Sequence, residues 1–272
     1  MNDHLNNLLL GLADDAWMIA EPALLSHAST MAALAASSPG TIRPSGDDRE
    51  KPSIADGIAT IEVSGPMANR KSLFGRLFGL KETTYTGIRE QLSFAAESED
   101  VRAVALLFDT PGGKSTGVAS AAHDIASFYS RTGKPCYGVA SMCASAGLWL
   151  ASGCQEIIAE PGATIGSVGA ILSIADVSRM LANLGVKVDV IKSSKHKGVG
   201  APGTSLTDES RAYLQGYVDS LHAAFVGTLK EYRPMMSEGA MDGRIFTAEQ
   251  AIELRMCDRI ERDAMAYIRR SV

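Results

Sequence analysis

Apolar residues recur along this chain with two different periods. After residue 56, short apolar runs such as GIATIEVSG, VRAVALLFDT and VKVDVIK are rich in branched side chains, which is typical of buried strands. Longer stretches between such runs, for example residues 206–231, carry apolar residues at the three-to-four-residue spacing of helices. The repeated strand–helix order predicts an α/β protein with a largely parallel, buried sheet.

The N-terminal part of the chain does not follow this order. Residues 1–36 contain spaced leucines followed by an alanine-rich run, which predicts a helical segment. Residues 37–53 collect proline, glycine, serine and charge without any period, which is typical of a linker. We therefore expect an N-terminal helical extension over 1–36, a linker over 37–53 and one domain over 54–272.

The composition is that of an ordinary globular protein. Hydrophobic residues make up 46% of the 272 positions and charged residues 21%, so the chain can bury a core. The net charge of −5 argues against a nucleic-acid partner, because such proteins usually carry a basic surplus. No segment reaches the roughly 18 consecutive apolar residues of a membrane-spanning helix, so we expect a cytoplasmic chain without a membrane anchor.

No cofactor or metal is expected from the sequence. The four cysteines form no CxxC pair and no zinc-like spacing with histidine, which is typical of reduced, buried thiols. The phosphate-binding patterns GxGxxG and GxxxxGK[ST] are both absent, which disfavours a nucleotide.

A glycine turn follows the apolar strand VALLF. Asp109–Gly113 reads DTPGG, and ligands of α/β proteins bind at the carboxyl ends of parallel strands. Two consecutive glycines let backbone N–H groups approach a ligand, and such donors can stabilise an oxyanion. The alternative is a plain tight turn.

Ser145 is the second candidate for chemistry, in the stretch SMCASAGLWLA. Gly147 completes half of a GxSxG elbow, but Cys143 occupies the position of the first glycine. A serine at a strand-to-helix junction can be a nucleophile, or a structural residue that bonds its own helix. Cys143 is a conceivable nucleophile too, although no neighbour in the sequence obviously lowers its pKa.

A nucleophilic serine needs a base, and lysines cluster at residues 192–198. A lysine can act as a base when burial lowers its pKa to about 7–8. His196 is the rival base in the same segment, and a solvated basic loop is the alternative without function.

Together these pieces resemble the Ser-Lys peptidases of the signal peptide peptidase A family, in the ClpP/crotonase superfamily. The resemblance extends over about residues 55–262, and it rests on five motifs in the family's order. They are Asp109–Gly113, Ala144–Gly147, Gly166–Gly169, Ser193–Pro202 and Asp242–Thr247. Three positions depart from the family's pattern: Ser194 replaces a glycine, Gly198 replaces an aspartate, and Arg255 replaces a glycine.

The resemblance implies a ClpP/crotonase-like fold of repeated ββα units and gives each motif a role. Ser145 would be the nucleophile, and Lys197, the second lysine of its motif, would be the base. Ser167 would hold the lysine amine. Backbone N–H groups would form the oxyanion hole, contributed by Gly112 or Gly113 together with Ala146.

The N-terminal segment resembles the phage head-maturation (lambda capsid protein C-like) branch of this family. That branch implies scaffold and capsid proteins as substrates, in the host cytoplasm or the prohead, and a ring-shaped homo-oligomer whose subunits shape one another's sites. The alternatives are a bacterial signal-peptide-peptidase-like protease acting on membrane or cytosolic peptides, a crotonase-type acyl-CoA enzyme, and a non-catalytic capsid or scaffold component.

Overall fold

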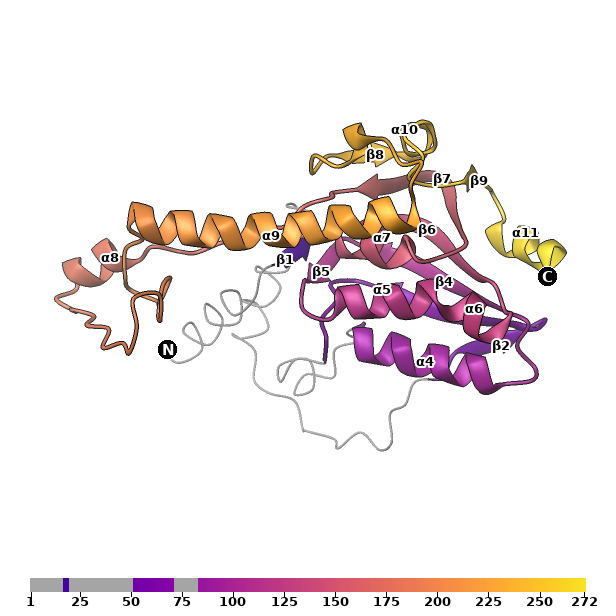
Figure 1. The fold of residues 1–272 in the computed structure, drawn as a ribbon, viewed down its shortest axis with the longest axis horizontal. Coiled ribbons are helices and arrows are strands. Elements are labelled where there is room, and N and C mark those ends of the chain that lie inside the picture. The colour runs from indigo at the N-terminus through magenta and orange to yellow at the C-terminus, as the bar shows by residue number, and fades with distance from the viewer. Residues whose placement is uncertain (1–16, 20–50, 71–82) are drawn as a thin grey trace.

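The computed structural model describes residues 17–19, 51–70 and 83–272, and seven strands of these residues form the main sheet (Figure 1). Its order is β2-β3-β4-β6-β7-β8, with β9 beside β7. The strands are β2 (Ser53–Ala55), β3 (Ile58–Ser64), β4 (Ala103–Thr110), β6 (Cys136–Ala144), β7 (Glu156–Gly166), β8 (Ile245–Thr247) and β9 (Arg259–Ile260).

The centre of the sheet is parallel. β3, β4, β6 and β7 run in one direction, and β9 is parallel to β7. The antiparallel strands are β2, at the edge beside β3, and β8, beside the end of β7. The predicted α/β class with a largely parallel, buried sheet is confirmed.

Helices cover both faces of this sheet. One face of β4, with Val104 and Leu106, belongs to the core that includes the buried faces of α4, α5 and α7. The other face, with Ala103 and Ala105, packs in a second cluster with Ile268 of α11. The helices are α4 (Tyr85–Glu97), α5 (Val118–Ala126), α6 (Phe128–Thr132), α7 (Ala146–Ala151), α8 (Ser178–Asn183), α9 (Asp208–Tyr232), α10 (Ala248–Glu253) and α11 (Ala264–Ser271), with a 3₁₀ turn at Glu238–Ala240.

Residues 169–224 project from this body as an arm, which contains α8 and the first two thirds of α9 (Figure 1). No side chain of the arm is buried. The strand predicted for VKVDVIK is wrong, because residues 186–192 form no strand. Their alternating valines, Val186, Val188 and Val190, are exposed, and no strand of the described residues pairs with them.

A short strand replaces part of the predicted N-terminal helix. Residues 17–19 form β1 (Trp17–Ile19), which pairs antiparallel with β5 (Gly112–Lys114). The helix predicted over 1–36 is therefore wrong at these residues, where aromatic and branched side chains favour a strand next to an available edge. The remainder of 1–36, and the linker up to residue 50, lie outside the described residues.

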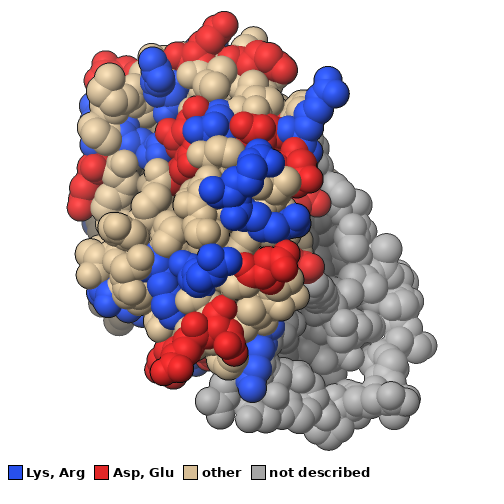
Figure 2. All heavy atoms as spheres, turned by 90° about the vertical axis from the view of Figure 1, so that its right-hand side faces the viewer, with Lys and Arg blue, Asp and Glu red and all other residues tan. Residues whose placement is uncertain are grey.

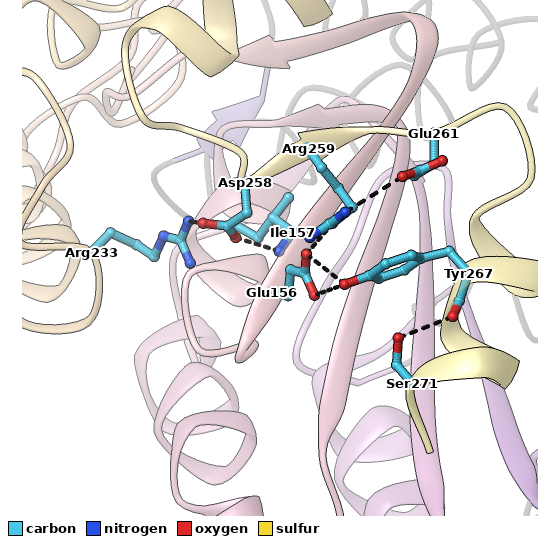
Figure 3. Close-up of polar contacts among 8 residues, drawn as sticks. All are labelled: Glu156, Ile157, Arg233, Asp258, Arg259, Glu261, Tyr267 and Ser271. Atoms are coloured by element: carbon cyan, nitrogen blue, oxygen red, sulfur yellow. Dashed lines mark hydrogen bonds and ion pairs between the residues drawn. The ribbon is translucent and has the colours of Figure 1, made fainter.

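A polar network holds the C-terminal segment against β7 (Figure 3). Arg259 of β9 forms an ion pair with Glu156, and the Tyr267 hydroxyl of α11 donates to the same carboxylate at 3.1 Å. Asp258 accepts a hydrogen bond from the Ile157 N–H at 2.7 Å and pairs with Arg233 at 2.5 Å. These contacts fasten β9 and the start of α11 to the sheet.

The face that carries the C-terminal end has charged side chains of both signs. Figure 2 shows acidic and basic side chains interspersed over it, without a large patch of one sign, which is typical of a solvated surface. Within the described ranges, no helix combines the length and the apolar character that crossing a membrane requires.

We expect Lys134→Met to destabilise the fold, because the Lys134 amine caps the C-terminus of α4. Its Nζ donates to the carbonyls of Ala95, Ala96 and Ser98 at 2.9, 3.0 and 2.7 Å. Losing these charge-assisted bonds should lower the free energy of unfolding by about 1–2 kcal/mol in urea titrations. Lys230→Met, which removes an exposed pair with Glu238, is the control and should change it by less than about 0.5 kcal/mol. Equal effects would contradict the capping role.

Candidate active site

Three of the sequence motifs meet at the carboxyl ends of adjacent parallel strands. β4 ends at Thr110, β6 at Ala144 and β7 at Gly166, and these strands are neighbours in the order β4-β6-β7. The glycine turn, Ser145 and Ser167 directly follow those strand ends. Because parallel strands end at the same edge of a sheet, distant motifs are brought together there.

Ser145 stands at the sharp turn between β6 and α7, with φ 53 and ψ −118. A positive φ is rare and costly for a residue with a side chain, so the surrounding structure must hold it. Its N–H donates to the Gly166 carbonyl at 2.7 Å, and its own carbonyl accepts from the Trp149 N–H at 3.0 Å. The sequence suggested a strand-to-helix turn at this serine, and the structure has one.

The Ser145 side chain is buried, with a relative exposure of 1%. Its Oγ has no hydrogen-bond partner among the described residues. Buried hydroxyls almost always have a partner, so an unpaired one calls for an explanation such as a catalytic role. A purely structural serine would use its hydroxyl to bond its own helix.

The glycine turn lies against the start of α7. A Cβ on Gly147 would come 2.6 Å from Thr110 Cγ2, and α7 also packs against β5. Thr110 stabilises the turn, because its Oγ1 donates to the Gly65 carbonyl at 2.6 Å and accepts from the Gly112 N–H at 3.1 Å. The Gly112 N–H is thus already engaged within the turn.

Gly113 has to be a glycine because Met67 approaches its backbone. An added Cβ would lie 2.2 Å from the Met67 carbonyl oxygen. Met67 also forms hydrogen bonds with the residues on either side of Gly113. Its N–H donates to the Gly112 carbonyl at 2.9 Å, and its carbonyl accepts from the Lys114 N–H at 2.8 Å. The N–H of Gly113 points away from Met67, because successive residues of a strand direct their backbone groups to opposite sides.

Ser167 directly follows Gly166, whose carbonyl accepts the hydrogen bond from the Ser145 N–H. Like Ser145, Ser167 has a positive φ, of 56°. Its N–H donates to the Arg244 carbonyl at 2.7 Å. Asp242 holds the Arg244 side chain in turn: its two carboxylate oxygens accept hydrogen bonds from Arg244 Nε at 3.0 and 2.8 Å. The hydrogen bond from Arg244 lowers the pKa of the Asp242 carboxyl group. The Asp-Gly-Arg motif thus forms the turn that supports Ser167.

Lys197 has no contact with Ser145 among the described residues of this chain. The Lys197 side chain is exposed and lies on the arm. The two residues before it contact the first half of α9, because Lys195 forms an ion pair with Glu209 and the His196 ring stacks on Tyr213. α7 instead contacts α9 at Phe225, which stacks on Trp149 with ring centroids 4.6 Å apart. Tyr213 and Phe225 are separated by about 18 Å along the helix. The rival base His196 lies on the same arm.

Cys143 is a poor nucleophile in this structure. Its side chain is fully buried, and burial raises the pKa of the thiol well above its usual value. The thiol therefore remains protonated at neutral pH, and only a thiolate is strongly nucleophilic. No cluster of three or more histidine, cysteine or acidic side chains suited to a metal occurs in the part of the chain that the structure describes.

Sequence reasoning missed two supporting groups. Thr110 lies inside the DTPGG motif, and its hydroxyl could have been suspected from its position before the glycines. The Arg244 carbonyl could not, because a backbone oxygen leaves no signal in the identity of its own residue.

Comparison with known proteins gives consistent matches. The model of peptidase family S49 matches residues 129–270, a range that contains Ser145, Ser167 and Lys197. The chain is 33% identical to the Synechocystis protein slr0021, named as a protease, over 77% of this chain and 72% of that one. It is 30% identical to capsid assembly protease C of Escherichia phage lambda, over 84% of this chain but only 54% of the phage protein.

Solved structures that resemble this one have low sequence identity. An enoyl-CoA hydratase/isomerase family member matches with a TM-score of 0.44 and 17% identity, over 81% of this chain and 75% of that one. A membrane protease of Pyrococcus horikoshii, specific for a stomatin homolog, matches with a TM-score of 0.40 and 15% identity, over 79% and 78%.

Gly166→Ala tests how tightly the Asp-Gly-Arg turn approaches β7. Gly166 has φ 139, and an added Cβ would lie 2.4 Å from the Arg244 carbonyl oxygen. Backbone strain and this clash should together lower the free energy of unfolding by about 2–4 kcal/mol.

The matched control is Gly162→Ala, on the same strand. Gly162 has φ 82, but an added Cβ there meets no atom within 4 Å. It should cost only the backbone strain, about 1 kcal/mol. Urea unfolding of both variants measures the difference, and equal losses would show that Arg244 does not restrict Gly166.

Proposed function

Because the chain belongs to peptidase family S49, we propose that it is a serine endopeptidase with Ser145 as nucleophile and Lys197 as general base. One observation carries the assignment of Ser145: a buried serine hydroxyl that has no partner among the described residues, held at positive φ beside a glycine turn. Membership of a peptidase family favours this function over that of a crotonase-type acyl-CoA enzyme.

The proposed reaction passes through an acyl-enzyme. Ser145 Oγ attacks the scissile carbonyl while a neutral Lys197 amine accepts the hydroxyl proton. The tetrahedral oxyanion accepts hydrogen bonds from the N–H groups of Gly113 and Ala146. The C–N bond then breaks, and the leaving amine takes the proton from the lysine. Water, deprotonated by the same lysine, attacks the ester and releases the second product with Ser145 restored.

Gly113 is a better oxyanion donor than Gly112 in this proposal. The Gly112 N–H is engaged by Thr110 within the same turn, whereas the Gly113 N–H points away from Met67, to the side on which β1 pairs with β5. Ser167 would orient the lysine amine through its hydroxyl, and the Arg244 carbonyl fixes its backbone beside Ser145.

We further propose that Lys197 acts on the Ser145 of a neighbouring subunit in a ring-shaped oligomer. Within one subunit Lys197 is exposed and on the projecting arm, so a second copy would complete the site. Exposed apolar side chains along the arm support an interface there. They are Met180, Leu184, Val186, Val188, Val190, Ile191, Tyr213 and Tyr217.

The substrates we propose are scaffold and capsid proteins during phage prohead maturation. The relative that supports this is capsid assembly protease C of phage lambda. A general peptide-degrading role is the second candidate, supported by a relative in Enterococcus faecium named as a signal peptide peptidase, 28% identical over 75% of this chain and 59% of that one.

Single substitutions separate the two candidate bases. Ser145→Ala should reduce peptidase activity to background, and Lys197→Ala should reduce kcat by at least about 100-fold, because a positioned base contributes that much. His196→Ala is the matched control on the same loop and should retain near-normal activity. Activity that survives Lys197→Ala and disappears in His196→Ala would make the histidine the base.

Co-expression of two inactive variants tests whether the dyad forms between subunits. A Ser145→Ala chain still supplies Lys197, and a Lys197→Ala chain still supplies Ser145. In a randomly mixed ring with one lysine donor per site, about a quarter of the sites would be intact, so about a quarter of wild-type activity should return. Mixed oligomers of confirmed composition that remain inactive would place both groups in the same chain.

Scaffold processing can be followed by mass spectrometry of co-expressed scaffold and major capsid proteins. Defined cleavage products should form with the wild-type chain and be absent with Ser145→Ala. Intact scaffold and capsid proteins beside a chain that cleaves other peptides would support the general degrading role instead.

A further inference from the structure

The two sides of β5 have different partners. On one side Met67 bonds Gly112 and Lys114, and on the other side lies β1, paired antiparallel in the register Trp17 to Lys114 and Ile19 to Gly112. Figure 1 shows β1 beside β5 and below α9.

Backbone directions identify which residue of β1 faces the glycine turn. The Gly112 carbonyl and the Lys114 N–H both point towards Met67, so the N–H and carbonyl of Gly113 point to the opposite side. β1 lies on that side, with Met18 opposite Gly113. The backbone groups of Met18 therefore face Gly113, and those of its neighbour Ile19 point away from β5.

A polypeptide substrate needs the same side of β5. A peptide bound in extended form adds its backbone to an exposed strand edge, and its main-chain groups supply much of the affinity. The proposed oxyanion donor is the Gly113 N–H, so the scissile carbonyl must approach the side of β5 on which β1 lies. β1 and a substrate cannot both take that position.

We propose that the edge of β5 opposite Met67 is the docking strand for extended polypeptides and that β1 is its occupant within the same chain. This inference rests on the proposed function, because it takes Gly113 as an oxyanion donor. The described pairing of β1 with β5 spans three residues, and a substrate strand that pairs over a greater length can displace it. The apparent Kd for a substrate is then the intrinsic Kd divided by the fraction of molecules in which β1 is undocked.

Two proline substitutions in β1 test the competition. Met18→Pro removes the N–H that faces Gly113 and places the ring against β5, so β1 should undock. Ile19→Pro is the matched control, because the N–H that it removes points away from β5. The full-length chain is used throughout, in a Ser145→Ala background for binding and in the wild-type background for turnover.

The binding probe is a labelled synthetic peptide with the sequence of residues 13–23, which contains β1. Fluorescence anisotropy should give a Kd at least about fivefold lower for the Met18→Pro chain than for the Ser145→Ala parent, with little change for Ile19→Pro. In turnover, Met18→Pro should lower KM for an unstructured peptide by a similar factor and leave kcat nearly unchanged. Hydrogen exchange at the Gly113 amide should become faster in Met18→Pro alone.

Three outcomes would overturn the inference. One is Gly113 exchange that is the same in all three chains, since β1 then does not pair with β5. Another is faster exchange without tighter peptide binding, since the edge then does not bind polypeptide. The third is an equal effect of both prolines, since the register then does not matter. Failure of the proposed function is distinguishable, because peptide binding and amide exchange remain measurable in a chain that cleaves nothing.

Discussion

The hydrogen bond from the Ser145 N–H to the Gly166 carbonyl is the contact on which the site depends. It is made where β6 and β7 end, directly after the last pair of that ladder, Ala144 with Gly166. A serine at φ 53 stores backbone strain, and it remains there only because the strand before it and the helix after it are both buried. The same bond places Ser167 next to Ser145.

The support for this contact extends outwards through the backbone. The Arg244 carbonyl holds Ser167, and β8 pairs with the end of β7. On the other side, Thr110 ties the glycine turn to Gly65 and Gly147 packs on Thr110. These supports are hydrogen bonds to main-chain carbonyls or close contacts with glycine, so they depend on the backbone more than on the identity of the side chains.

Much of the fold and part of the candidate site could be predicted from the sequence. Buried parallel strands read as continuous apolar runs, so the strands of the sheet centre were recognisable, and turn residues marked their ends. DTPGG, Ser145 and Ser167 were expected to act together, and they do meet at neighbouring strand ends. The strand VKVDVIK and the helix at residues 17–19 were wrong, because a local pattern does not say whether a sheet edge lies beside it.

What the sequence determined by itself was the set of chemical groups and the order of motifs, and through them the α/β class and the family. The tertiary structure decided which groups meet. It placed Ser145 and Ser167 together through the β6–β7 register, and it left Lys197 exposed on an arm in which no side chain is fully buried. It also paired β1 with the glycine turn. Proximity depends on strand pairing and burial between residues far apart in the chain, and a linear pattern records neither.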